Sequence, residues 1–425
     1  MIPSPYSEKS LKQHFRVGDS GKWKIDVEAN IDEITRSASE RAASVTPTLS
    51  ILSKIDRSGK TVYFAGDLET DLILRATYSR LIHQYSVSLP NREDIISGII
   101  EATSEACPFL VTKCDIRDFY GSLNSEPILN EILVNTRVSP DLKSILRAIY
   151  AATGASKSVA LRGLALSTLV AELALKDFDR EIRKIPGVHR YFRYADDIII
   201  FSIPATQVIH EVEKKLNRLG LELNSKSEIE QVRTNPAKVT PPDSGFVEYT
   251  YLGYQFTVGE VVKQYRTREF NVSIAPAKVS KRTTRIFLSL HAFLRDLDGS
   301  LLIDRLNYLS TNRSVYKTKH ARGSRKEKIR TGLHYNYSRC GRYPASQGGR
   351  VRTSHDALEL MKIDVVLKFA LFSKNSEFST RVAELSVGLQ RQLQSISFVQ
   401  GYKKRLMKRF TRERVGKICK VWGHE

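Results

Sequence analysis

The stretch RYFRYADDIIIFSI, residues 190–203, decides how the chain is interpreted. Its two halves, 190–194 and 198–203, are rich in β-branched and aromatic residues, which predicts two strands joined by a tight turn. The turn carries two adjacent aspartates, Asp196 and Asp197. Neighbouring carboxylates in semi-apolar surroundings repel each other unless a cation neutralises them. An isolated pair of this kind is more often an exposed turn, so its surroundings decide the interpretation.

A third aspartate follows another predicted strand. A short apolar strand is expected at 109–111, and the run FLVTKC (109–114), which contains it, leads directly to Asp115. Mg²⁺ prefers hard oxygen ligands and completes its shell with waters and substrate phosphates. Two such ions roughly 3.5–4 Å apart can activate a hydroxyl and stabilise a leaving phosphate oxygen. The three aspartates therefore predict a metal-dependent site for phosphoryl chemistry.

The rest of the chain mixes helices and strands. Residues 1–104 are expected to be mostly helical, with a strand at 61–64. A long helix is expected over 164–183, and strand-like segments follow at 221–232 and 248–262. Beyond about residue 278 the sequence is again helical and basic. This order predicts an α+β fold with one mixed, largely antiparallel sheet, helices on one of its faces and helical regions on both sides.

Composition narrows the class of protein. The chain has 425 residues, with 67 Lys and Arg against 46 Asp and Glu, a formal net charge of +21. With 41% apolar and 27% charged residues it is neither disordered nor a low-complexity polymer. No run reaches the roughly 18 uncharged apolar residues of a membrane helix. The first residues lack the features of a secretory leader, and the four cysteines show no CxxC spacing. We therefore expect a cytoplasmic protein without a membrane partner.

The positive charge is concentrated in two runs of the last quarter. Residues 313–352 hold twelve Lys and Arg against Glu327, and residues 403–420 hold nine against Glu413. Such patches favour a polyanionic partner, and tyrosines among the cations suit stacking on unpaired bases. The alternative is a solvated helical face or a basic tail. The candidate nucleic-acid-binding residues are Lys317, Lys319, Arg322, Arg325, Lys326, Lys328, Arg330, Lys403, Lys404, Arg405, Lys408 and Arg409.

Five segments, in this order, resemble the successive motifs of reverse transcriptases. They are DIRDFYGSL (115–123), RGLALSTLVAELAL (162–175), RYADDIIIFS (193–202), LELNSKS (221–227) and YLGYQF (251–256). The resemblance implies a right-hand polymerase fold with an N-terminal extension and fingers (1–104), an antiparallel-sheet palm with packed helices and intervening fingers helices (105–260), and a basic helical thumb and C-terminal region (261–425). It implies an RNA-directed DNA polymerase that uses two Mg²⁺ ions, for which Mn²⁺ is a possible substitute.

The resemblance also implies roles for single residues around the aspartates. Asp115 and Asp196 would be the main metal ligands, with Asp197 as the second member of the pair. The Ile116 carbonyl would be a further metal ligand. Tyr120 matches the aromatic residue that stacks under the sugar and excludes a 2′-hydroxyl, which would favour deoxynucleotides. The alternative for Tyr120 is a place in the core.

Further residues match parts of the family that hold the nucleotide and the primer. Lys226 matches a lysine near the incoming triphosphate, and Arg75 and Arg92 resemble arginines of the fingers that clamp it. Leu252-Gly253-Tyr254 matches the turn that grips the primer end. The alternatives are a solvated lysine, structural ion pairs and an ordinary hairpin glycine.

One segment departs from the family pattern. Reverse transcriptases commonly carry Pro-Gln-Gly where this chain reads Leu161-Arg162-Gly163. Arg162 adds a cation near the expected position of the template or nucleotide, so both Arg162 and Gly163 are candidate nucleotide-binding residues.

The motif set resembles bacterial reverse transcriptases of antiphage defence, relatives of the retron and group II intron enzymes, and among them the compact type 3 subunit. This implies dNTPs, a noncoding RNA template and a DNA product as partners. A second reverse transcriptase subunit or a homo-oligomer is also possible.

Three hypotheses for function follow. The first is templated DNA synthesis on the bound RNA. The second is untemplated or protein-primed synthesis by the same site. The third is an RNA-binding scaffold whose polymerase core is idle.

Overall fold

We describe a computed structural model of the chain over residues 4–16, 18–56, 58–204, 206, 208–225, 227–232, 235–236, 246–259, 261–262, 268–317, 327–343 and 358–423. The fold is of the predicted α+β class. It divides into two compact units: the first is Met1–Ile95, Phe109–Ile229 and Lys317–Glu327, and the second is Ile96–Pro108, Glu230–Tyr316 and Lys328–Glu425. The division into 1–104, 105–260 and 261–425 stays a prediction. Within the described ranges, no helix has the length and apolar character needed to cross a membrane.

The first unit contains most of the helices that precede residue 220. They are α1 (Glu8–Leu11), α2 (Asp19–Trp23), α3 (Val27–Ala43), α4 (Leu68–Gln84), α6 (Phe119–Ser122), α7 (Glu126–Val134), α8 (Pro140–Thr153), α9 (Ala165–Ala174), α10 (Lys176–Arg183) and α11 (Val208–Asn217), with a 3-10 turn at Lys12–His14. Local chemistry explains several ends. Asp67 caps α4 by accepting from the Thr70 N–H, and α8 begins at Pro140 and ends before Gly154 in a left-handed conformation.

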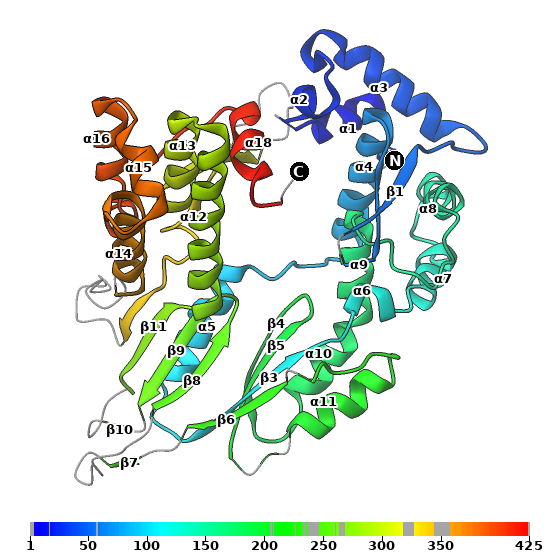
Figure 1. The fold of residues 1–425 in the computed structure, drawn as a ribbon. Helices are drawn as coiled ribbons and strands as arrows, with labels where there is room; N and C mark the ends of the chain where they lie inside the picture. Colours follow the sequence, from blue (N-terminus) through cyan, green and yellow to red (C-terminus); the bar gives the residue numbers. More distant parts are fainter. Residues whose placement is uncertain are drawn as a thin grey trace. The chain divides into compact units, whose positions relative to one another are not determined.

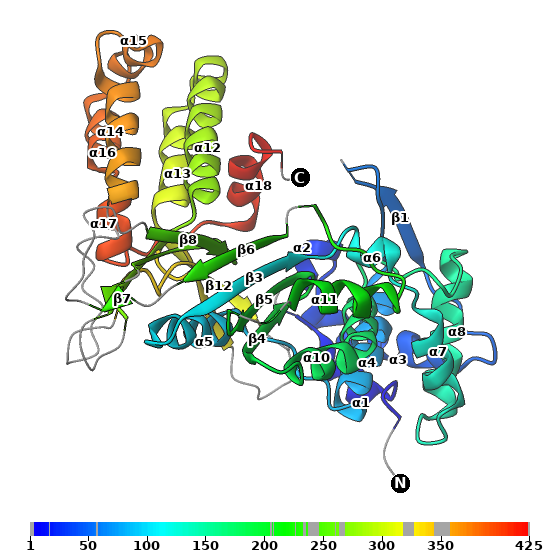
Figure 2. The same cartoon turned by 90° about the horizontal axis from the view of Figure 1, so that it is seen from below.

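The sheet that contains Asp115 has the strand order β4-β5-β3-β6, and the first three strands in this order belong to the first unit. Its strands are β3 (Phe109–Asp115), β4 (Val188–Tyr194), β5 (Asp197–Ser202) and β6 (Glu228–Val232), and β5 is antiparallel to both β3 and β4. The central strand β5 is buried from Ile198 to Ser202, as expected for a strand covered on both faces. Helices α10 and α11 pack against the sheet (Figure 2). A separate antiparallel hairpin consists of β1 (Ile51–Ile55) and β2 (Thr61–Ala65).

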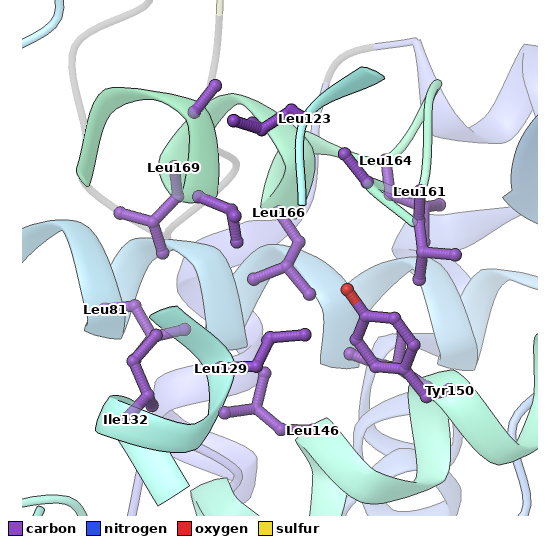
Figure 3. Close-up of a cluster of buried hydrophobic side chains, with 14 of the residues drawn as sticks. Leu81, Leu123, Leu129, Ile132, Leu146, Tyr150, Leu161, Leu164, Leu166 and Leu169 are labelled. Carbon is purple, nitrogen blue, oxygen red and sulfur yellow. The ribbon is translucent and has the colours of Figure 1, made fainter. Parts of the chain in front are cut away.

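A helical core lies beside this sheet. Figure 3 shows side chains of α4, α7, α8 and α9 meeting in one cluster, among them Leu81, Ile132, Leu146 and Leu169. Each of these four side chains is at most 1% exposed. Burying a leucine or isoleucine fully stabilises a fold by about 1.5–3 kcal/mol. The cluster therefore holds the start of α9, which follows the Leu161-Arg162-Gly163 segment, against the other helices.

The second unit combines a second sheet with a group of helices. Its four-stranded sheet has the order β14-β11-β9-β8, formed by β8 (Phe246–Tyr251), β9 (Tyr254–Gly259), β11 (Phe270–Ile274) and β14 (Gly341–Tyr343). Helix α5 (Arg92–Ser104), which passes from the first unit into the second, contacts this sheet: Thr103 and Tyr249 share a hydrogen bond of 2.5 Å between their hydroxyls. Minor pairs are β7 (Asn235–Pro236) with β10 (Val261–Val262) and β12 (Asn312–Lys317) with β13 (Glu327–Gly332).

The helices of the second unit follow the sheet in sequence. They are α12 (Pro276–Asp296), α13 (Gly299–Ser310), α14 (Leu358–Phe372), α15 (Glu377–Ala383), α16 (Val387–Ser395), α17 (Phe398–Lys403) and α18 (Arg412–Lys420). Figure 1 shows α12 and α13 side by side, with α14, α15 and α16 next to them.

Two expectations about the fold are wrong. The strands of 248–262 do not join the sheet that carries the aspartates, because they pair with each other and with β11 and β14 to form a second sheet. The helix expected over 164–183 is two helices, α9 and α10, which meet at Leu175. The Leu175 side chain is buried, so the apolar pattern of the sequence continues across the point where the first helix ends and the second begins. The basic region beyond residue 278 also contains short strands besides its helices.

Candidate active site

The turn between β4 and β5 presents the aspartate pair. Tyr194 and Asp197 face each other at the end of the ladder, so Ala195 and Asp196 form a two-residue turn. Ala195 has a φ of +55°, in the left-handed region that such tight hairpins require. Asp196 therefore lies at the tip of the hairpin, and Asp197 is the first residue of β5.

Asp115 lies next to this turn, at the end of the neighbouring strand. It is the last residue of β3 and is the ladder partner of Asp197. The Ile116 N–H donates to the Asp196 carbonyl oxygen over 3.3 Å. The structure thus brings Asp115, Ile116, Asp196 and Asp197 together at one edge of the sheet.

The carboxylates of this edge influence one another. Burial raises the pKa of Asp196, and the negative charge of Asp115 raises it further. A backbone hydrogen bond and the positive charge of Lys60 have the opposite effect and lower the pKa of Asp196. Because the charge of Asp115 contributes to the upward shift, a cation bound between the two carboxylates would favour the ionised form of Asp196.

Asn224 supports Asp115 directly, and the sequence analysis did not identify it. Its side-chain Nδ2 donates to Asp115 Oδ2 over 2.8 Å, and its backbone N–H donates to the Asp115 carbonyl over 2.7 Å. The signal was present, since Asn224 belongs to the LELNSKS motif, in which only Lys226 was singled out. Lys226 itself lies outside the described residues.

Lys60 also contributes to the electrostatics of the site, although no sequence motif identifies it. It follows the turn of the β1–β2 hairpin, and its Nζ forms an ion pair with Asp118, three residues after Asp115. Residues so far apart in sequence show no shared pattern, so only the folded chain reveals that this lysine acts on Asp196.

Tyr120 lies on the short helix α6, which follows Asp115. Its side chain is half-buried and packs against the core of the first unit, with its ring centroid 5.0 Å from that of Phe119. This placement is compatible with the core alternative, and the sugar-excluding role stays a prediction.

Arg162 and Gly163 join the start of α9 to the β1–β2 hairpin. The Arg162 carbonyl accepts from the Tyr63 N–H over 2.8 Å, and its guanidinium lies 3.4 Å from the Asp56 carboxylate. Gly163 has a φ of +101°, and a Cβ there would lie 2.5 Å from the Tyr63 carbonyl oxygen. This close approach by itself requires a glycine at position 163, independently of any role in nucleotide binding.

Arg75 and Arg92 both have partners in the protein. The Arg75 guanidinium is buried and donates to both carboxylate oxygens of Asp19, at 2.7 and 2.9 Å, and to Asp71 at 2.8 Å. This is the structural ion pair that stood as the alternative to a triphosphate clamp. Arg92 is half-buried at the start of α5, 3.4 Å from Glu93.

The predicted primer turn, Leu252-Gly253-Tyr254, belongs to the second unit. Leu252 and Gly253 have φ values of +45° and +84° between β8 and β9. The Gly253 carbonyl accepts from the Ala275 N–H over 2.9 Å, and Tyr254 is fully buried beside Tyr337, with 5.6 Å between ring centroids. The turn is therefore anchored to the start of α12.

The cationic residues of the second run are exposed. Lys403, Lys404, Arg405, Lys408 and Arg409 all face solvent around the end of α17. Among the predicted residues of the first run, Arg330 is described with its side chain, and it is exposed beside the Tyr335 ring. Lys319, Arg322, Arg325 and Lys326 lie outside the described residues, as do the side chains of Lys317 and Lys328.

The edge of the sheet with Asp115, Asp196 and Asp197, here called the acidic edge, offers few side chains that could bind a metal ion. Within the described ranges, no group of three or more His, Cys, Asp and Glu side chains has the arrangement of a metal site. Mg²⁺ differs from zinc in that it is commonly held by one or two carboxylates, with waters and substrate phosphates as its other ligands. Two carboxylates within mutual electrostatic range and a neighbouring carbonyl fit that ion.

Part of the chain is similar to known proteins. Residues 71–256, which include all three aspartates, match the reverse transcriptase (RNA-dependent DNA polymerase) family. No curated protein matches the chain. The similar solved structures include telomerase from Candida tropicalis (13% identity, TM-score 0.33, covering 50% of this chain and 53% of that one). They also include telomerase from Candida albicans (14% identity, TM-score 0.34, covering 64% and 53%). The chain spans about half the length of these telomerase chains.

The family match covers the sheet edge with its aspartates, the hairpin that presents them and helices α9 and α10. The chain therefore carries a reverse transcriptase domain over residues 71–256, the domain of RNA-directed DNA polymerases, which are nucleotidyltransferases.

Proposed function

We propose that the chain is an RNA-directed DNA polymerase that adds deoxynucleotides to a primer by a two-metal mechanism, copying a bound noncoding RNA. The observation that carries the proposal is the position of Asp115 beside Asp196 and Asp197 at the ends of adjacent strands, inside a segment that matches the reverse transcriptase family.

In this proposal the acidic edge holds the metal ions. Asp115 and Asp196 would be the carboxylate ligands, with Asp197 and the Ile116 carbonyl beside them. Bound divalent ions would supply charge stabilisation for the attacking and leaving oxygens. Asn224 would keep the Asp115 carboxylate oriented, and Tyr120 would restrict the sugar. The second cationic run, 403–409, would contact nucleic-acid phosphates.

The direct test is primer extension with labelled dNTPs, Mg²⁺ and an RNA template. We expect the double variant Asp196→Ala, Asp197→Ala to lose about 10³-fold or more of the incorporation rate, equivalent to about 4 kcal/mol of transition-state stabilisation. The matched control is Asp177→Ala, which removes an exposed carboxylate of the same unit and should retain full activity. Undiminished incorporation by the double variant would refute the proposal.

A role in antiphage defence is a further part of the proposal, and the motif resemblance alone supports it. The corresponding test is phage plating on cells that express the gene in its native surroundings. Protection that needs Asp196 and Asp197 would support the role. Protection that survives their replacement would favour an RNA-binding scaffold, and the absence of any protection would remove the defence role. The comparisons offer no support for a second polymerase subunit.

A further inference from the structure

In the second unit, an arginine guanidinium lies over an aromatic ring that is itself held in place. Arg313, near the start of β12, has its guanidinium carbon 3.9 Å from the centroid of the Tyr308 ring. Tyr308 lies near the end of α13 and is partly exposed. The rings of Phe410 and Trp422 each lie 5.7 Å from it, measured between centroids. The guanidinium of Arg313 therefore rests on a support that its aromatic neighbours keep fixed.

The Arg313 guanidinium retains its capacity to donate hydrogen bonds. Over the ranges that the structure describes, it makes no hydrogen bond and no ion pair, and the residue is partly exposed. Two more guanidinium groups lie within electrostatic range. Burial lowers the pKa of Arg282, the phenol of Tyr337 raises it, and the positive charges of Arg285 and Arg313 lower it further. Three arginines that repel one another favour the binding of an anion beside them.

Backbone pairing places Arg313 next to the second cationic run, residues 403–409. The Asn312 N–H donates to the Leu406 carbonyl over 2.8 Å, and the Lys408 N–H donates to the Asn312 carbonyl over 2.8 Å. The two segments run parallel at this point. Arg313 directly follows the paired residue, and the cationic side chains of the run are exposed. A guanidinium supported by a ring thus lies beside a row of exposed positive charges.

This combination fits the unpaired nucleotides of a single strand. Proteins bind single strands with cations that follow the phosphates and with flat groups on which bases stack. The guanidinium of arginine is planar, delocalised and weakly hydrated, so a base can stack on it as on an aromatic ring. A base on the outer face of Arg313 would complete a stack of base, guanidinium and Tyr308 ring. An acidic peptide would match the charges but would leave this flat face without a flat partner.

We propose that the Arg313 guanidinium, supported by Tyr308, stacks on an unpaired base of a single-stranded nucleic acid whose phosphates lie along the second cationic run. The proposal rests on the phosphate contacts that the proposed function gives to residues 403–409. It uses no residue of the acidic edge, so a failure of catalysis and a failure of base stacking are separate results.

The experiment measures, by fluorescence anisotropy, the affinity for a labelled RNA strand of about 12 nucleotides and for an abasic strand of the same length. Arg313→Lys keeps the charge but removes the flat group. We expect it to weaken binding of the normal strand by about 5–150-fold, the range for one lost base stack. Binding of the abasic strand should stay at the wild-type value. The matched control, Arg391→Lys at an exposed arginine of α16, should change neither affinity.

Two further measurements separate stacking from charge and from folding. Because Arg313→Lys keeps the number of cations, the slope of log affinity against log salt should equal that of the wild type. The wild type itself should bind the normal strand more tightly than the abasic one, a comparison that needs no variant. A DNA strand of the same length identifies the ligand, since either sugar supports stacking and the tighter strand names the sugar.

Several results would overturn the proposal. Equal affinity of the wild type for normal and abasic strands would show that it contacts no base. Unchanged binding of the normal strand by Arg313→Lys would remove Arg313 from stacking, and an equal loss on both strands would assign it to a phosphate or to the stability of the fold. If the wild type binds neither strand, the phosphate role of residues 403–409 fails as well, and the cations are left to an acidic protein partner.

Discussion

At the scale of single residues, the Asp115 carboxylate is oriented by a neighbour from a distant part of the chain. Asn224 bonds both the carboxylate and the backbone of Asp115. A ligand held in this way loses less freedom when it binds a cation. Partners of ligating carboxylates typically contribute 10–100-fold to metal affinity or activity.

We predict that Asn224→Ala lowers the incorporation rate by about 10–100-fold and raises the Mg²⁺ concentration needed for half-maximal activity. The backbone bond from residue 224 is retained, so the melting temperature should change little. Magnesium titrations of primer extension measure the effect, with the exposed Asn217→Ala as control. An unchanged Mg²⁺ requirement would show that Asn224 does not act through the metal.

The backbone conformation at position 163 requires a glycine. We predict that Gly163→Ala destabilises the first unit by at least about 1–3 kcal/mol, because its φ of +101° disfavours a side chain and the new Cβ would meet the Tyr63 carbonyl. The control is Gly416→Ala within α18, where a Cβ meets no atom within 4 Å. That change should stabilise by about 0.5–1 kcal/mol. Thermal unfolding of both variants distinguishes the signs, and equal melting temperatures would contradict the prediction.

At the scale of elements, Arg193 joins β4 to the two helices that follow the altered Pro-Gln-Gly segment. Its guanidinium is buried and donates to Glu172 of α9 and to Asp179 of α10, with distances of 2.8 Å to each. Tyr191 of β4 donates to the same Asp179 over 2.6 Å. The network fixes the first strand of the aspartate hairpin to the helices packed on it.

We predict that Arg193→Leu destabilises the first unit by about 3–5 kcal/mol, because it leaves two partly buried carboxylates without their cation. Arg180→Leu is the matched control, since Arg180 pairs with Asp177 at the surface and its loss should cost less than about 0.5 kcal/mol. Urea unfolding followed by a spectroscopic probe measures both. A loss below 1 kcal/mol for Arg193→Leu would mean that the network contributes little.

At the scale of the whole molecule, the charge of +21 and the exposed second cationic run bear on nucleic-acid binding. We predict that replacing Lys403, Lys404, Lys408 and Arg409 by Gln reduces the slope of log affinity against log salt by about 3 for single-stranded RNA, because each lost phosphate contact removes about 0.7.

The measurement is RNA binding between 50 and 200 mM salt. A control with the same charge change, at exposed Lys176, Lys184, Lys214 and Arg218 of the α10 and α11 region, should leave the slope nearly unchanged. If the wild type and the 403–409 variant have equal slopes, residues 403–409 do not contact the phosphates of the RNA.

Particular residues show how far the sequence could predict the site. The β4–β5 hairpin and the strand before Asp115 were predictable, since both are short apolar runs next to acidic turns. The contributions of Asn224 and Lys60 were not, because their partners lie far away in sequence and leave no periodic signal. The same limit applies to Arg75, whose buried ion pairs depend on how α2 packs against α4.

By itself the sequence determined the α+β class, the three aspartates and the order of the motifs, because hydrophobic periodicity and residue chemistry are local properties of the chain. Only the tertiary structure decided that the 248–262 strands form a sheet of their own and that Asp115 and Asp197 are ladder partners. Strand pairing and burial depend on contacts between distant segments, and these contacts exist only once the chain has folded.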